Sequence, residues 1–151
     1  MQDYNFLSAE LKRVLKEKKL KYTLQREIVL RTLFSHSGHH SPEELLQLIR
    51  EGFPDVNIGI ATLYRTLALF EEAGLAESLS FGKDGKKYEI GHKHHHDHLV
   101  CIECNKIIEF HDDLIEQRQL EVVKKFNFKM LNHTMNIIGI CDECQKKNEE
   151  K

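Results

Sequence analysis

The sequence contains no long apolar run, no strong excess of charge of either sign and no visible secretion signal. Its longest uncharged apolar stretches lie around residues 58–63 and 135–140, far short of the roughly 20 residues needed to cross a bilayer. The 22 Lys and Arg nearly balance 24 Asp and Glu, giving a formal charge of −2, which excludes a histone-like polycation and a disordered acidic chain. The N-terminal segment MQDYNFLSAELK lacks the apolar stretch behind basic residues that defines a signal peptide. We therefore expect a soluble, cytoplasmic protein.

Charge and metal-binding residue types are unevenly distributed along the 151 residues. Residues 1–31 carry eight Lys and Arg against four acidic residues, whereas the segment from His92 onward holds all four Cys and seven of the ten His. At 17.7 kDa the chain can form one mid-sized domain or two small ones. The asymmetry predicts two, with a boundary near residues 90–93.

The first part of the chain has the pattern of helices followed by a hairpin. Start signals predict one helix capped by Ser8 and ending near Lys18, and others that begin after Thr23, after Ser41 and at Gly59. Residues 77–81 and 86–90 flank the turn sequence Gly-Lys-Asp-Gly and predict two strands. This order is typical of a winged helix-turn-helix, which binds DNA; a three-helix core with an appended hairpin is the alternative.

The second part predicts a small α/β domain, so that the whole chain belongs to the α+β class. Strands are expected at residues 97–101, 106–110 and 135–140, and a helix from Asp112 to Phe126. The apolar stripe of that helix consists of Ile115, Val122, Val123 and Phe126.

The fourth helix carries candidate DNA-reading residues. Ala61, Thr62 and Arg65 lie opposite its apolar stripe, which is formed by Ile60, Leu63, Leu67 and Phe70, and Tyr64 lies on the flank. Arginine can bind guanine O6 and N7, and tyrosine can contact a thymine methyl group. Phosphate contacts are predicted for Lys21, Lys83, Lys86 and Lys87. A solvated helix face with ordinary charges is the alternative interpretation.

The cysteines form two pairs of identical spacing, Cys101-Ile-Glu-Cys104 and Cys141-Asp-Glu-Cys144. In a reducing compartment such pairs indicate metal binding rather than disulfides. Four thiolates complete the tetrahedral shell of a structural zinc ion and leave no position for a catalytic water.

The run His94-His95-His96-Asp97-His98 predicts two further metal sites. In an extended strand, His96 and His98 point to one face while His95 and Asp97 point to the other. Imidazole and carboxylate ligands suit Fe²⁺, Mn²⁺ or Zn²⁺. Candidate partners are Glu89, Glu109, Glu116 and His133, and an exposed polar strand with adventitious metal affinity is the alternative.

Several segments together resemble the ferric uptake regulator (Fur) family over roughly residues 6–145. They are YTLQR at 22–26, IATLYRTL at 60–67, YEI at 88–90, HHHDHLVCIEC at 94–104 and KIIEF at 106–110. The resemblance implies a homodimeric, metal-responsive repressor that binds a double-stranded, palindromic operator, with higher oligomers on DNA left open. Residues 1–91 would form the winged-helix DNA-binding domain, and residues 92–151 the α/β dimerisation and metal-binding domain. Lys21, Ala61, Thr62, Tyr64 and Arg65 would contact DNA.

The resemblance also implies three metal sites. Structural Zn²⁺ would bind Cys101, Cys104, Cys141 and Cys144. The regulatory site would comprise His39, Glu89, His96, His98 and Glu109, with His40 as the alternative to His39. A second site would comprise His95, Asp97, Glu116 and His133.

The regulatory metal is expected to be Fe²⁺, with Mn²⁺ or Zn²⁺ able to replace it. Relatives that sense peroxide tend to have aspartates at the positions of Glu89 and Glu109, so the two glutamates favour the iron sensor. Zinc-, manganese- or peroxide-sensing repressors of the same family are the alternatives. A metal-dependent hydrolase is disfavoured because the sequence has no HExxH motif, and a metal carrier would not need a winged helix. We therefore expect a non-enzymatic regulator.

Overall fold

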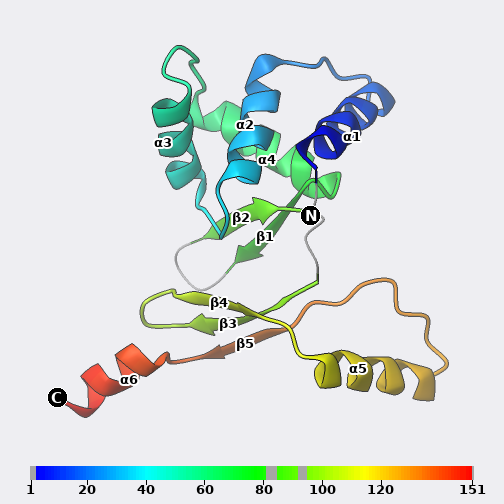
Figure 1. Ribbon diagram of the computed structural model, residues 1–151, viewed down its shortest axis with the longest axis vertical. Helices are drawn as coiled ribbons and strands as arrows, with labels where there is room; N and C mark the ends of the chain where they lie inside the picture. The colour runs from blue at the N-terminus through cyan, green and yellow to red at the C-terminus, as the bar shows by residue number, and fades with distance from the viewer. Residues whose placement is uncertain (1–2, 81–84, 92–94, 151) are drawn as a thin grey trace. The chain divides into compact units, whose positions relative to one another are not determined.

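The computed structural model describes residues 3–80, 85–91 and 95–150. Within them the chain forms six helices and five strands in an α+β fold (Figure 1). It divides into two compact units, residues 1–93 and 94–151, which are considered separately below. No helix among the described residues is both long and apolar enough to span a membrane.

The N-terminal unit contains four helices, α1 (Tyr4–Glu17), α2 (Leu24–Ser35), α3 (Pro42–Gly52) and α4 (Ile60–Glu72). The Thr23 side chain caps α2, and Ser41 and Glu44 form a capping box at the start of α3. The apolar faces of all four helices meet in one core that includes Leu11, Leu30, Leu45, Leu63 and Phe70. Burial of these large side chains stabilises the unit by the hydrophobic effect.

A hairpin follows α4 and completes the winged arrangement. Strands β1 (Ala76–Ser80) and β2 (Lys86–Ile90) pair antiparallel. Residues 81–84, which include the last residue of the first predicted strand and Lys83 of the predicted turn, lie outside the described residues. Beyond β2, a Cβ atom at Gly91 would lie 2.3 Å from the Gly74 carbonyl oxygen. Only glycine permits this close approach of the two backbone segments.

Two predictions for this unit were wrong in detail. The first helix begins at Tyr4 after the N-cap Asp3, not after Ser8, because Leu7 already belongs to the buried stripe of α1. Ile60 is 39% exposed rather than part of the core-facing stripe of α4, because it is the first residue of that helix.

The C-terminal unit is built on a three-stranded sheet in the order β4-β3-β5. Strand β3 (Asp97–Cys101) pairs antiparallel with β4 (Ile107–Phe110) and parallel with β5 (Asn136–Gly139). Helix α5 (Asp113–Lys125) connects β4 to β5. A short helix, α6 (Asp142–Glu149), ends the unit and had not been predicted.

This second unit has little core of its own. No residue of α5 is buried, so the predicted apolar stripe of that helix is largely uncovered: Val122 is exposed and Phe126 is 77% exposed. Strand β5 likewise exposes Ile137 and Ile138. Apolar surface of this extent is typical of an interaction face.

Candidate metal centres and DNA-contacting residues

The four cysteines converge at one end of the C-terminal sheet. Cys101 is the last residue of β3, Cys104 lies in the following turn, and Cys141 and Cys144 belong to the N-cap and first turn of α6. Their sulfur atoms all lie within 4.8 Å of one another, and none forms a disulfide. This geometry fits the tetrahedral thiolate shell of zinc.

Backbone groups form hydrogen bonds with the sulfur atom of Cys101 in this cluster. The Cys141 N–H donates to the Cys101 sulfur at 3.3 Å. Hydrogen bonds from the backbone of Cys141 and Cys104 lower the pKa of the Cys101 thiol to about 6. The pKa of Cys144 is raised, first by its hydrogen bond with Cys141 and then by burial. The Cys101 thiol therefore ionises readily, whereas the raised pKa of Cys144 favours its protonated form. A bound divalent cation would stabilise both as thiolates.

A second cluster joins β3, α5 and the segment before β5. His95 Nε2 lies 3.2 Å from both Asp97 Oδ1 and Glu116 Oε1, and His133 Nε2 lies 3.3 Å from Glu116 Oε2. One ligand atom from each of these four residues lies within 4.8 Å of the others. Asp97 is completely buried, and its Oδ2 atom has no hydrogen-bond partner among the described residues. A buried carboxylate oxygen is costly unless paired, so this donor set fits a divalent cation.

Replacing His133 by alanine is expected to weaken metal binding at this second cluster more than about tenfold, because the set loses one of its two imidazoles. The measurement is a Mn²⁺ or Zn²⁺ titration of protein that retains its tightly bound zinc. His36→Ala is the matched control, since His36 is exposed directly after α2 in the N-terminal unit, where its Nδ1 lies 2.9 Å from Thr32 O. Equal metal affinity in the two variants would remove His133 from the ligand set.

In the N-terminal unit, the segment before α3 brings a histidine onto the hairpin. His40 and Tyr88 form an antiparallel bridge, with His40 N–H donating to Tyr88 O at 2.9 Å and Tyr88 N–H to His40 O at 2.7 Å. In this register the preceding residue, His39, lies opposite Glu89. His39 Nε2 is 3.1 Å from Glu89 Oε1, and both side chains are buried, 5% and 1% exposed.

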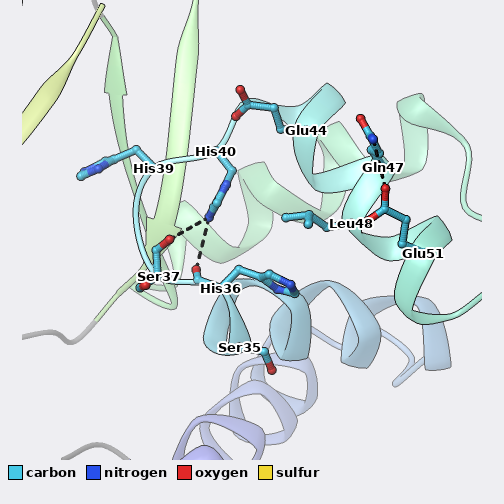
Figure 2. A pocket seen from close by; sticks show the side chains of 9 residues that line it. All are labelled: Ser35, His36, Ser37, His39, His40, Glu44, Gln47, Leu48 and Glu51. Carbon is cyan, nitrogen blue, oxygen red and sulfur yellow. Dashed lines mark hydrogen bonds between the residues drawn. The ribbon is translucent and has the colours of Figure 1, made fainter.

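The same bridge distinguishes His39 from His40. Figure 2 shows the two side chains pointing in different directions. The His40 ring is directed toward the end of α2, where its Nε2 lies 3.3 Å from His36 O and 3.2 Å from Ser37 O. His39, not His40, therefore belongs with Glu89.

In the C-terminal unit, His96, His98 and Glu109 share one face of the sheet. His98 pairs directly with Glu109 across β3 and β4, and His96 lies two residues earlier, on the same side. His96 Nε2 lies 3.7 Å from Glu109 Oε1, and the two imidazole centroids are 4.8 Å apart. His98 Nδ1 lies 3.3 Å from Asn136 Oδ1 on β5. A hydrogen bond donated by Nδ1 directs Nε2 to act as the acceptor for a metal.

The predicted DNA-contacting residues are accessible in the N-terminal unit. Ala61, Tyr64 and Arg65 are exposed on α4, Thr62 is half-buried, and Lys21 is exposed before α2. Arg65 forms no ion pair with the described residues. Tyr64 donates to Glu43 Oε1 at 3.1 Å, and this hydrogen bond raises the pKa of Tyr64. The phenol is therefore held by α3 rather than disposed freely on the helix surface.

The chain matches the model of the Ferric uptake regulator family over residues 17–138. It is 46% identical over 145 residues to the ferric uptake regulation protein of Campylobacter jejuni, covering 96% of this chain and 92% of that protein. The chain belongs to the ferric uptake regulator family.

Solved structures of the family share its fold. The ferric uptake regulator of Helicobacter pylori, whose structure reveals three functional metal-binding sites, is 40% identical, with a TM-score of 0.85 over 95% of both chains. The regulator of Francisella tularensis, solved with iron, is 32% identical, with a TM-score of 0.72 over 83% of this chain and 95% of that one.

Sequence reasoning missed some residues that support these sites. Asn136 orients His98, Glu43 holds Tyr64, and Glu27 binds two tyrosines. None lies in a motif of ligand type or spacing, so only the pairing of distant segments reveals them.

Proposed function

We propose that this member of the ferric uptake regulator family is an Fe²⁺-dependent repressor that binds palindromic promoter DNA as a homodimer and represses iron-uptake genes. The observation that carries this proposal is the presence of His-carboxylate donor sets beside a separate thiolate set, in a chain that begins with a winged helix. Thiolates suit Zn²⁺ held for structure, whereas imidazole and carboxylate suit a labile ion such as Fe²⁺.

The regulatory ion would connect the two units of the chain. His39 and Glu89 would contribute ligands from the first, and His96, His98 and Glu109 from the second. An ion that binds both would restrict the angle between them and hence the spacing of the two α4 helices of a dimer along a palindrome. The ion shifts this equilibrium only by its difference in affinity for the two arrangements.

Dimer formation would use the second unit. The exposed apolar side chains of β5, such as Ile137 and Ile138, and of Phe126 at the end of α5 need a partner surface. A second copy of the chain offers the same face, as a two-fold interface requires. Two winged helices in one particle would then match the two halves of an operator.

The deciding experiment is fluorescence anisotropy of a labelled fragment from the protein's own promoter region under anaerobic conditions. Protein that retains tightly bound zinc but no other metal is titrated separately with Fe²⁺, Mn²⁺ and Zn²⁺. We expect DNA binding with Fe²⁺, and with Mn²⁺ as its stable substitute. Binding only with Zn²⁺ would instead make this a zinc sensor, and tight binding without added metal would contradict metal control.

The Arg65→Ala variant is expected to lose about 1–3 kcal/mol of discrimination between operator and random DNA, because a bidentate contact to guanine is removed. Arg65 is exposed on α4 and without a carboxylate partner among the described residues. Binding constants for both DNA fragments at several salt concentrations provide the measurement.

Lys21→Ala is the matched comparison for Arg65→Ala. Removal of a lysine that contacts phosphate should weaken binding to both fragments equally. It should also make the slope of log affinity against log salt concentration shallower by about the value of one phosphate contact. If Arg65→Ala shows this same uniform loss, Arg65 contacts phosphate and not a base.

A further inference from the structure

One carboxylate connects three parts of the N-terminal unit. Glu27, in the first turn of α2, accepts hydrogen bonds from the hydroxyls of Tyr4 on α1 and Tyr22 in the segment before α2. Ser8 on α1 lies 3.5 Å from the same carboxylate, and Arg31, one turn further along α2, lies 4.0 Å from it. We call these five residues the Glu27 cluster.

Burial of the Glu27 carboxylate in this cluster costs free energy. The Glu27 side chain is only 13% exposed, and burial disfavours a charged carboxylate. Hydrogen bonds from Tyr22 and Tyr4 nevertheless keep the pKa of Glu27 below its usual value. Burial and the same hydrogen bonds raise the pKa of each tyrosine to about 12, so both remain donors at neutral pH.

Attachment of α1 does not depend on this cluster. Leu7, Leu11 and Leu15 are almost completely buried in the core of the unit, and their burial already holds the helix. Apolar contacts are non-directional, however, whereas hydrogen bonds from two hydroxyls to the two oxygens of one carboxylate have defined directions. The cluster is therefore suited to fix the rotation of α1 and the path of the segment that follows it.

The elements held in this way carry unpaired positive charge. Lys12 on α1 lies 5.5 Å above the ring of Tyr22, and the carbonyl of Lys21 accepts a hydrogen bond from Arg26. Arg13 and Lys18 are paired with carboxylates. The lysines of this region that form no ion pair within the described residues are Lys12, Lys16, Lys19 and Lys21, all exposed.

We propose that Glu27 is a positioning residue for DNA binding: through Tyr4 and Tyr22 it holds α1 and residues 18–22 so that Lys12 and Lys21 contact DNA phosphates together. The inference rests on the proposed DNA-binding function and adds α1 to the phosphate-contacting surface. If Glu27 acted only through its charge, its removal would strengthen DNA binding, because loss of a carboxylate increases the attraction of the unit to phosphate. A positioning role predicts the opposite, a weaker complex.

The test uses the full-length, metal-loaded protein and a labelled promoter fragment, with dissociation constants measured between 50 and 300 mM salt, as in a counterion-release analysis. The main variant is Tyr4→Phe/Tyr22→Phe, which removes two hydroxyls without changing charge. We expect the negative slope of the logarithm of the association constant against the logarithm of the salt concentration to become shallower by about 0.9, the value of one phosphate contact, and affinity at 0.1 M salt to fall about eightfold. Glu27→Gln should change both quantities in the same direction.

Glu17→Gln is the matched control, because it removes a negative charge from α1 at an exposed residue whose one ion pair among the described residues is with Arg13. It should bind DNA as well as or better than the natural protein. Thermal unfolding checks that each variant is folded. If the variants are destabilised, Tyr22→Phe alone, at a half-exposed residue, provides the same comparison.

The salt slope separates positioning from mere stability, because a smaller folded fraction lowers apparent affinity without changing the number of phosphates contacted by each bound molecule. An unchanged slope in Tyr4→Phe/Tyr22→Phe would overturn the proposal, as would Glu27→Gln binding more tightly in the manner of Glu17→Gln. Absence of DNA binding by the natural protein would instead contradict the proposed function itself.

Discussion

Replacing Cys101 by serine is expected to abolish zinc binding and to unfold much of the C-terminal unit. Structural zinc sites in zinc-finger peptides contribute about 10–16 kcal/mol to folding, which is as large as the total stability of a typical domain, about 5–15 kcal/mol. This unit depends on the ion especially strongly, since Cys144 is the only buried residue of α6 and no residue of α5 is buried. Zinc content per chain, sedimentation behaviour and far-UV circular dichroism are the measurements, and we expect loss of zinc, of the dimer and of part of the ordered structure.

Glu103→Gln is the control for this experiment. Glu103 lies between the two cysteines of the first pair and is exposed, with a hydrogen bond from Asn148. Its variant should keep both zinc and dimer. A stable, zinc-free dimer of Cys101→Ser would show that the four sulfurs do not hold the unit together.

The His96→Ala variant is expected to lose most of its metal-dependent gain in DNA affinity while it retains the thiolate-bound zinc. Allosteric couplings between two sites are typically worth about 5–150-fold in affinity, and removal of one imidazole ligand should bring that factor close to one. His96 faces Glu109 on the sheet surface opposite to Asp97, so the second cluster should be unaffected. Anisotropy titrations with Mn²⁺ at fixed protein concentration measure the change.

His40→Ala separates this effect from a general loss of histidine. The His40 ring contacts two carbonyls and the His36 ring at the end of α2, and its bridge to Tyr88 uses backbone atoms that alanine retains. Its metal response should therefore match that of the natural protein. A normal metal response in His96→Ala would exclude His96 from the regulatory site.

Most helices and strands follow from local sequence because their signals are local. Thr23 caps α2, Ser41 and Glu44 close the capping box of α3, and both predicted strand patterns of the hairpin lie within a residue of the observed ones. Alternation along residues 95–98, which lead into β3, separates His96 and His98 from His95 and Asp97, because successive side chains of an extended chain point to opposite faces. The contacts of these residues follow the same division.

Helix α6 and the start of α1 show where local reasoning fails. The sequence of α6, DECQKKNE, has no apolar stripe, and a helix of eight residues is not stable by propensity alone. It forms here beside the cysteine cluster. At the start of α1, Tyr4 donates a hydrogen bond to Glu27 of α2, and the two residues are 23 apart in the chain.

Residue types and their spacing were enough to predict the ligand types, their division into thiolate and His-carboxylate sets, and the order of helices and hairpin, since spacing within one element fixes which side chains share a face. Three contacts instead depend on how distant segments pack: His39 rather than His40 meets Glu89, Asn136 orients His98, and Glu27 joins two tyrosines. Each of these depends on the register between segments distant in the chain. Such a register is set by packing of the whole unit and leaves no periodic trace in the sequence.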